Sequence, residues 1–418
     1  MTCQLLTYTN LIQLLISDQY LKKWIGLPRC ATTTVLHAMN ALNISKISSL
    51  FKEAHCVTHA ATRLKGDSRV NHAIDNKLSR ETNLLRKKSV TVEAEKIYQQ
   101  CLNYNLVQGE IPNPDASLTT TEDLENEVAP TPPPKKFVEE VKNDIKERVR
   151  ADENIKIFDH IQTLVKQGKI LELVKLEETE FTWQSYIYNL PKGTMKFLLN
   201  STLDTLPTKA NLQQWGKRSN AQCGLHCGKK ETTNHILNCC VKGLPRFEWR
   251  HNNVLRYILS CLDMVKFKVF SDIENHQTSS GGTIPPYIQV TTLRPDLVII
   301  DKNKKTLSLF ELTVPGELRI KAAHKLKHTK YEHFEREITS HKATVIPFEI
   351  GSHTGLVTNE NKKYLHELHK FCKPEIKLKK FINNISAITV LSSFYIFNAR
   401  NDSDWSEDYP ITAPFPNQ

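Results

Sequence analysis

Four of the ten cysteines lie between residues 223 and 240, and this cluster constrains the fold more than any other feature of the sequence. The pattern Cys223-x3-Cys227-x7-His235-x4-Cys240 places three thiols and one imidazole at intervals that allow a tetrahedral Zn²⁺ site. A small, loop-rich segment needs such a tie to hold its shape. Because the protein would supply all four ligands, we expect a closed, structural zinc site.

Two neighbouring side chains are alternative ligands. His226 and Cys239 lie inside the same segment, and the spacing alone does not exclude either of them. The remaining cysteines are too sparse for a disulfide scaffold, so the clustering indicates metal binding in a reducing compartment. The longest uncharged apolar run, at residues 385–397, is too short to span a bilayer, and no secretory signal is visible. We therefore expect an intracellular protein with no membrane partner.

The charge balance indicates the class of partner. The 418 residues carry 56 Lys and Arg against 45 Asp and Glu, a formal net charge of +11, which suits a polyanion. The length allows two or three domains. The charge alone does not identify the polyanion, and the sequence leaves the oligomeric state open.

A break in composition divides the chain. Residues 105–134 contain six acidic residues, six prolines and no Lys or Arg, which predicts a disordered linker. We expect a helical region at 1–104 and helices again in 135–215, where Phe137, Val141, Ile145 and Val149 recur every four residues. The spacing of leucines from Leu5 to Leu21 supports the first of these regions.

The pattern changes to short strands after residue 291. Two β-type runs, at 297–300 and 307–314, are separated by a polar turn, and a helix and a further strand at 344–350 follow. This order predicts a mixed α/β domain. A two-residue turn at Asn303-Lys304 would place Asp296 directly opposite Glu311. Two opposed carboxylates suit a hard cation such as Mg²⁺, so both are candidate catalytic ligands.

The helix after the hairpin supplies candidate lysines. Its expected apolar stripe consists of Ala323, Leu326, Phe334 and Ile338. Lys327 interrupts this stripe and could stabilise phosphate charge, or its amine could simply extend into solvent. Lys330, on the neighbouring line, is the competing candidate.

Several short motifs also occur in a fixed order: KWIGLPR at 23–29, YNLPKG at 188–193, DTLPT at 204–208, WGKR at 215–218, ETTNHIL at 231–237 and WRHN at 249–252. They resemble the thumb, the helical linker and the CCHC zinc element of non-LTR retrotransposon reverse transcriptases. The resemblance favours Cys240 over Cys239 as the last zinc ligand. No Phe/Tyr-x-Asp-Asp motif occurs, so the polymerase acids are absent.

A second group of motifs, RPD at 294–296, ELTVP at 311–315, His324 with Lys327, KY at 330–331 and EIGS at 349–352, resembles the restriction-like endonuclease of the same elements. That nuclease is a variant of the PD-(D/E)xK fold. The resemblance implies Mg²⁺ bound by Asp296 and Glu311, and a catalytic lysine displaced to Lys327, because Thr313 stands where ordinary members carry lysine. The residues expected to contact or support nucleic acid are Arg250, His251, Arg294, Lys330 and Tyr331.

These observations predict five regions: a thumb remnant at 1–104, the linker at 105–134, a helical linker at 135–215, a zinc element at 216–260 and an endonuclease domain at 261–418. The expected fold is mixed, with helical parts followed by an α/β nuclease. The resemblance implies magnesium-dependent nicking of DNA in the nucleus, with DNA and possibly element RNA as partners. The alternative is a catalytically inactive, zinc-containing nucleic-acid-binding remnant of a retroelement.

Overall fold

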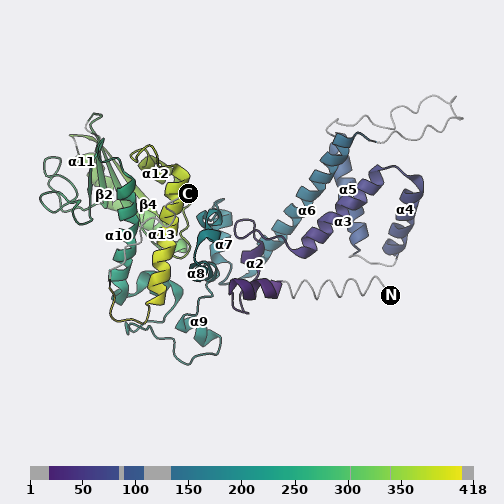
Figure 1. Cartoon of the computed structure of the whole chain (residues 1–418), viewed down its shortest axis with the longest axis horizontal. Coiled ribbons are helices and arrows are strands. Elements are labelled where there is room, and N and C mark those ends of the chain that lie inside the picture. Colours follow the sequence, from purple (N-terminus) through teal and green to yellow (C-terminus); the bar gives the residue numbers. More distant parts are fainter. Residues whose placement is uncertain (1–17, 84–88, 108–132, 302, 339, 407–418) are drawn as a thin grey trace. The chain divides into compact units, whose positions relative to one another are not determined.

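The protein combines helices with one small mixed sheet (Figure 1). A computed structural model describes residues 18–83, 89–107, 133–301, 303–338 and 340–406. Most of the predicted acidic linker and the leucines before residue 18 lie outside these residues. Among the described helices, none is both long enough and apolar enough to cross a membrane.

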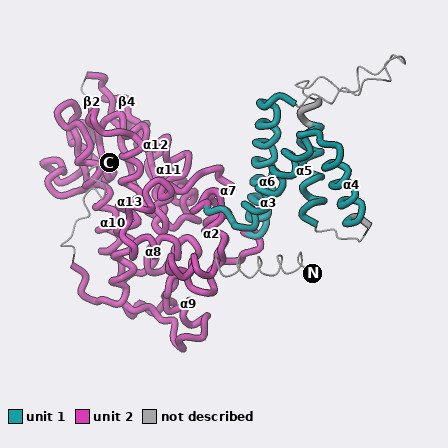
Figure 2. Tube along the Cα trace, turned by 45° about the vertical axis from the view of Figure 1, so that its right-hand side comes forward, with its two compact units in different colours: residues 1–16, 44–160 teal, residues 17–43, 161–418 magenta. Residues whose placement is uncertain are grey.

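The chain forms two compact units (Figure 2). Within the described residues, unit 1 comprises 44–160, and unit 2 comprises 18–43 together with 161–406. This division differs from the boundaries expected from composition, because a segment near the N-terminus belongs with the C-terminal two thirds of the chain.

Unit 1 consists of helices whose apolar faces meet. They are α3 (Ile47–Leu64), α4 (Ser68–Asn83), α5 (Val90–Val107) and most of α6 (Lys135–Thr163). The predicted stripe on α6 is confirmed, since Val141, Ile145 and Val149 are buried against residues of α3 and α5 and Phe137 packs beside them. Burial of this apolar stripe is what holds α6 in the unit.

Unit 2 is built on the sheet β1 (Lys268–Ser271), β2 (Leu297–Asp301), β3 (Thr306–Thr313) and β4 (Lys342–Glu349), in that order. The first three strands are antiparallel, and β3 pairs in parallel with β4. The parallel pair requires a crossover, which is α11 (Ile320–Glu337). All five residues of β2 are buried.

The register of the hairpin agrees with the sequence-based expectation. Leu297 pairs with Phe310, so the next pair outward is Asp296 with Glu311. The expected stripe on the following helix was wrong at Leu326, which is 71% exposed. Ile338, the residue directly after α11, is buried in the apolar cluster of the sheet as expected. Phe334 does pack against the sheet.

Long helices cover the sheet and complete its core. α10 (Leu244–Cys261), α12 (Asn359–His369) and α13 (Leu378–Asn398) contribute to one apolar cluster with β2 and β3. Since α10 belongs to this core, the expected border at residue 260 does not separate two structural parts.

Smaller elements hold the N-terminal segment of unit 2. Thr32 N donates to Gln167 Oε1 at 2.6 Å, and Gln184 Nε2 donates to Ala41 O at 2.6 Å. The elements concerned are a helix at residues 18–25, α2 (Thr34–His37), α7 (Lys169–Leu176), α8 (Lys192–Thr202), α9 (Lys209–Gln214), and the single turns η2 (Thr182–Ser185) and η3 (Ile187–Asn189).

Candidate metal centre and carboxylate cleft

The four residues predicted to bind zinc converge in the structure. The ligand atoms of Cys223, Cys227, His235 and Cys240 all lie within 4.8 Å of one another. The Sγ atoms of Cys223 and Cys240 are 3.8 Å apart, and Cys227 Sγ lies 3.2 Å from His235 Nε2. A tetrahedral ion about 2.3 Å from each sulfur requires a sulfur–sulfur separation of about 3.8 Å. The group is therefore compatible with Zn²⁺ in both donor type and spacing.

Local backbone geometry brings these ligands together. A β-bridge between Gln222 and Lys230 closes the loop that carries the first two cysteines, and Gly228 turns that loop with φ +80°. His235 begins the π-helical turn η4 (His235–Cys239), and Cys240 then takes an extended conformation. This change of backbone direction buries the thiol of Cys240.

The alternative ligands do not join the group. Cys239 is exposed, and its sulfur accepts a hydrogen bond from Asn234 Nδ2 at 3.3 Å. His226 occupies the turn with φ +52° and lies outside the set of converging atoms. Of the two adjacent thiols, the geometry selects Cys240.

A buried carboxylate that the sequence analysis missed supports the zinc loop. Glu231 is buried, and its Oε2 accepts a hydrogen bond from Gly224 N at 3.1 Å. Its other oxygen accepts from Lys209 N at 3.0 Å, at the start of α9. Glu231 thereby fixes the backbone beside Cys223 to a neighbouring helix, and the only available signal was its position inside the motif at 231–237.

The two predicted catalytic carboxylates lie at one end of the β2–β3 hairpin. Asp296 Oδ2 accepts from Leu312 N at 2.7 Å and lies 3.1 Å from His251 Nε2 on α10. Asp296 N donates to Glu311 Oε2 at 3.3 Å. Burial lowers the pKa of His251, but the charge and hydrogen bond of Asp296 outweigh it, so the net pKa of His251 is raised.

Three side chains of α11 surround Glu311, which is buried. Lys327 Nζ lies 2.6 Å from Glu311 Oε1, and Lys330 Nζ lies 3.6 Å from the same oxygen. Tyr331 donates its hydroxyl to Glu311 Oε2 at 3.0 Å. Burial and the negative charge of Glu311 both raise the pKa of Tyr331, so the phenol remains protonated and acts as a donor.

A third acid occupies the same row of the sheet. β1 and β2 pair Ser271 with Leu297, and one step further Asp272 N donates to the carbonyl oxygen of Asp296 at 3.2 Å. Asp272, Asp296 and Lys327 line one cleft of about 390 Å³. The long loop before β2 concealed this neighbour from sequence reasoning.

The cleft offers hard oxygen donors of the kind that Mg²⁺ prefers. Glu311 would have to share an oxygen with Lys327, and among the described residues only the Cys₃His group brings three or more ligand atoms together. The carboxylate oxygens are therefore suitable ligands for Mg²⁺, but they do not form a complete coordination site by themselves.

The residues predicted to contact nucleic acid lie in different environments. Arg250 is only 2% exposed; its guanidinium donates to Ser393 Oγ, Asn238 Oδ1 and Val314 O. A direct contact between Arg250 and nucleic acid does not fit this burial, because almost none of the side chain is exposed. Tyr331 is buried as well, so it can support the site but not a strand. Arg294 is exposed and pairs with Asp272 at 3.0 Å.

The sequence matches no protein-family model, and a search of curated proteins found no match either.

Proposed function

We propose that unit 2 is a divalent-metal-dependent DNA endonuclease of retrotransposon origin, and that this chain does not copy RNA. One observation carries the proposal. Asp296, Glu311 and Lys327 come from three separate elements and meet at one end of the sheet, with Lys327 Nζ 2.6 Å from Glu311 Oε1. A hairpin end that presents one carboxylate to the cleft and holds a second, buried one next to it, with a lysine beside them, suits phosphodiester hydrolysis.

Each group has a role in that reaction. Bound Mg²⁺ would supply a Lewis acid and an acidified water. Asp296 and Glu311 would hold the cation through oxygen, and Lys327 would offset negative charge at the phosphate. Tyr331 keeps the Glu311 carboxylate in position. Attack of water on phosphorus breaks the bond to the 3′ oxygen and leaves a 3′-hydroxyl and a 5′-phosphate. The 3′-hydroxyl is the end that can prime synthesis.

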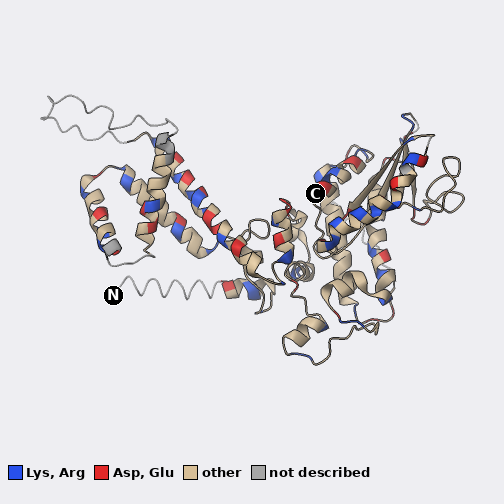
Figure 3. Ribbon diagram, turned by 180° about the vertical axis from the view of Figure 1, so that it is seen from behind, with Lys and Arg blue, Asp and Glu red and all other residues tan. Residues whose placement is uncertain are grey.

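The surface near the cleft suits a polyanion. The first part of α11 carries Lys321, Lys325, Lys327 and Lys330, and its acidic residues begin only at Glu332 (Figure 3). Lysines of this kind contact phosphates without reading base sequence. They would place a duplex over the cleft.

Nicking of supercoiled plasmid in the presence of Mg²⁺ tests the proposal. Asp296→Ala should abolish nicking, whereas binding of the plasmid should persist with the same salt dependence, because the lysines remain. Glu375→Ala removes an exposed carboxylate outside the cleft and serves as the matched control. Equal cleavage by Asp296→Ala and the wild type would refute the metal site.

The ion pair of Glu311 favours a second candidate function. Lys327 already neutralises this carboxylate, as in a structural pair, and this arrangement suits a nucleic-acid-binding remnant without catalysis. That function predicts salt-sensitive DNA binding and no nicking with Mg²⁺ or Mn²⁺. The plasmid assay separates the two.

A further inference from the structure

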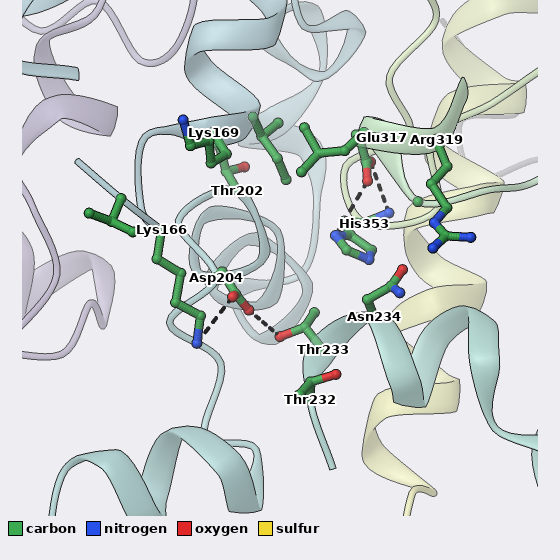
Figure 4. Close-up of a pocket in the computed structure, with 14 residues that line it drawn as sticks. Lys166, Lys169, Thr202, Asp204, Thr232, Thr233, Asn234, Glu317, Arg319 and His353 are labelled. Atoms are coloured by element: carbon green, nitrogen blue, oxygen red, sulfur yellow. Dashed lines mark hydrogen bonds and ion pairs between the residues drawn. The ribbon is translucent and has the colours of Figure 1, made fainter. Parts of the chain in front are cut away.

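A second cavity of unit 2, of about 340 Å³, is separate in its lining from the carboxylate cleft. Its walls come from the segment around α7, the start of the π-helical turn η4, the single turn η6 (Glu317–Arg319) and the loop after β4. Figure 4 shows Arg319, His353 and Asn234 on one side of the pocket and Lys166 with Asp204 on the other.

The pocket carries one cation without a protein partner. Arg319 is exposed, and its guanidinium makes no hydrogen bond or ion pair with any residue that the structure describes. The other basic groups are already held: Lys166 lies 3.2 Å from Asp204, and Lys169 lies 3.0 Å from Glu172. Arg319 is therefore the group with free donors, and a guanidinium fork suits a phosphate.

The wall beside Arg319 is rigidly built. Glu317 is completely buried, and its Oε1 accepts hydrogen bonds from His353 N, Thr354 N and Thr354 Oγ1. Its Oε2 lies 3.3 Å from His353 Nδ1, which fixes the orientation of the imidazole. A Cβ at Gly316 would come within 2.8 Å of Asn234 Oδ1, so a larger residue there would have to displace the Asn234 side chain. The turn that carries Arg319 is thus held from both sides.

The same pocket exposes apolar surface. Val165 is 88% exposed and Leu318, next to Arg319 in the chain, is 63% exposed. Thr232 Oγ1 accepts from His235 N at 3.1 Å, which leaves its hydroxyl proton to donate. A ligand that matches this lining has an anionic group for Arg319, a flat apolar body for Leu318 and polar edges for the hydroxyl and amide groups.

We propose that this pocket binds one nucleotide unit, with its phosphate on Arg319 and its base against Leu318 and Val165. The unit can belong to a free nucleotide or to a single strand, since both present the same groups. The proposal does not depend on the nuclease, because none of these residues lines the carboxylate cleft.

The full-length, zinc-loaded chain is tested without Mg²⁺, so that cleavage cannot interfere. The probes are AMP, ribose 5-phosphate and a fluorescent ten-nucleotide single-stranded DNA. Arg319→Ala should weaken binding of the nucleotide probe by about tenfold or more, as expected for a lost charge-assisted hydrogen bond. Leu318→Asp should weaken it similarly. Lys377→Ala, which removes an exposed charge outside the pocket, should change it less than about twofold.

The probes distinguish the sources of the nucleotide. If the wild type binds AMP and Arg319→Ala does not, the site takes a free nucleotide. If the wild type binds only the oligonucleotide and Arg319→Ala loses this binding, the site takes a single strand. Ribose 5-phosphate binding as tightly as AMP would overturn the proposal, because the base would then contribute nothing. Wild-type binding by a folded Arg319→Ala variant, or no binding of any probe by the wild type, would overturn it as well. Thermal melting verifies folding.

Discussion

Lys327 and Lys330 lie on the same helix and both pair with Glu311, but only Lys327, at 2.6 Å, is within hydrogen-bond distance of it. The loss of one positioned charge next to a reacting phosphate typically costs on the order of 10²–10³ in rate. We expect Lys327→Ala to reduce nicking by about that factor and Lys330→Ala to reduce it less, as measured by single-turnover cleavage of plasmid. Wild-type cleavage by Lys327→Ala would transfer the role to Lys330.

Thr313 allows a rescue experiment for the same charge. Its hydroxyl is buried without a hydrogen-bond partner in the described structure, and it lines the cleft together with Lys327. We expect the double variant Thr313→Lys, Lys327→Ala to recover part of the lost cleavage, because the new ammonium would approach the same cleft. Thr313→Ser with Lys327→Ala is the matched control, and equal rates for the two double variants would contradict the expectation.

Glu349 gives a pH-dependent prediction. Burial raises the pKa of this carboxyl, and the nearby His324 only partly opposes the shift. The folded state therefore binds a proton more tightly than the unfolded chain, so stability falls as the pH rises from about 4.5 through the folded pKa. Glu349→Gln should raise the melting temperature at pH 7 and change it little at pH 4. Equal shifts at both pH values would contradict this.

At the scale of elements, the zinc loop and the π-helical turn make a specific prediction about adjacent thiols. Zinc content per chain should be one for the wild type and for Cys239→Ser, and should fall for Cys240→Ser, because only Cys240 lies among the converging ligands. Metal analysis of the three purified proteins measures this. Unchanged zinc in Cys240→Ser would show that Cys240 is not a ligand.

Elements whose signals are local were predictable from the sequence. The register that pairs Asp296 with Glu311 followed from the strand pattern, although the paired strands end at Asp301 and Thr306 and not at a two-residue turn, and the metal ligands followed from spacing. Long-range packing was not predictable in this way. Nothing local shows that Arg250 is enclosed by α10, β3 and α13, or that a distant loop brings Asp272 to the same row. Leu326 was misplaced because an apolar residue on a helix can face solvent without large cost.

At the scale of the whole molecule, unit 2 is discontinuous in sequence. Residues 18–43 contribute backbone partners to Gln167 and Gln184, so a fragment of 161–418 lacks part of its own structure. We expect the fragment alone to melt at a lower temperature than the fragment mixed with a synthetic peptide of residues 18–43. The difference in melting temperature should grow with peptide concentration. A peptide of the same composition in scrambled order is the control. No shift with the native peptide would contradict the division into units.

The buried position of Arg250 limits which segments of this protein can be replaced by those of another protein. Its guanidinium joins Asn238, which lies between two zinc ligands, to the carbonyl oxygen of Val314 just after the acid-bearing strand. A zinc loop taken from another protein would leave this enclosed cation without one of its acceptors, at a cost of several kcal/mol. We therefore expect a chimera that replaces either the zinc loop or the sheet to be less stable unless Arg250 is replaced as well.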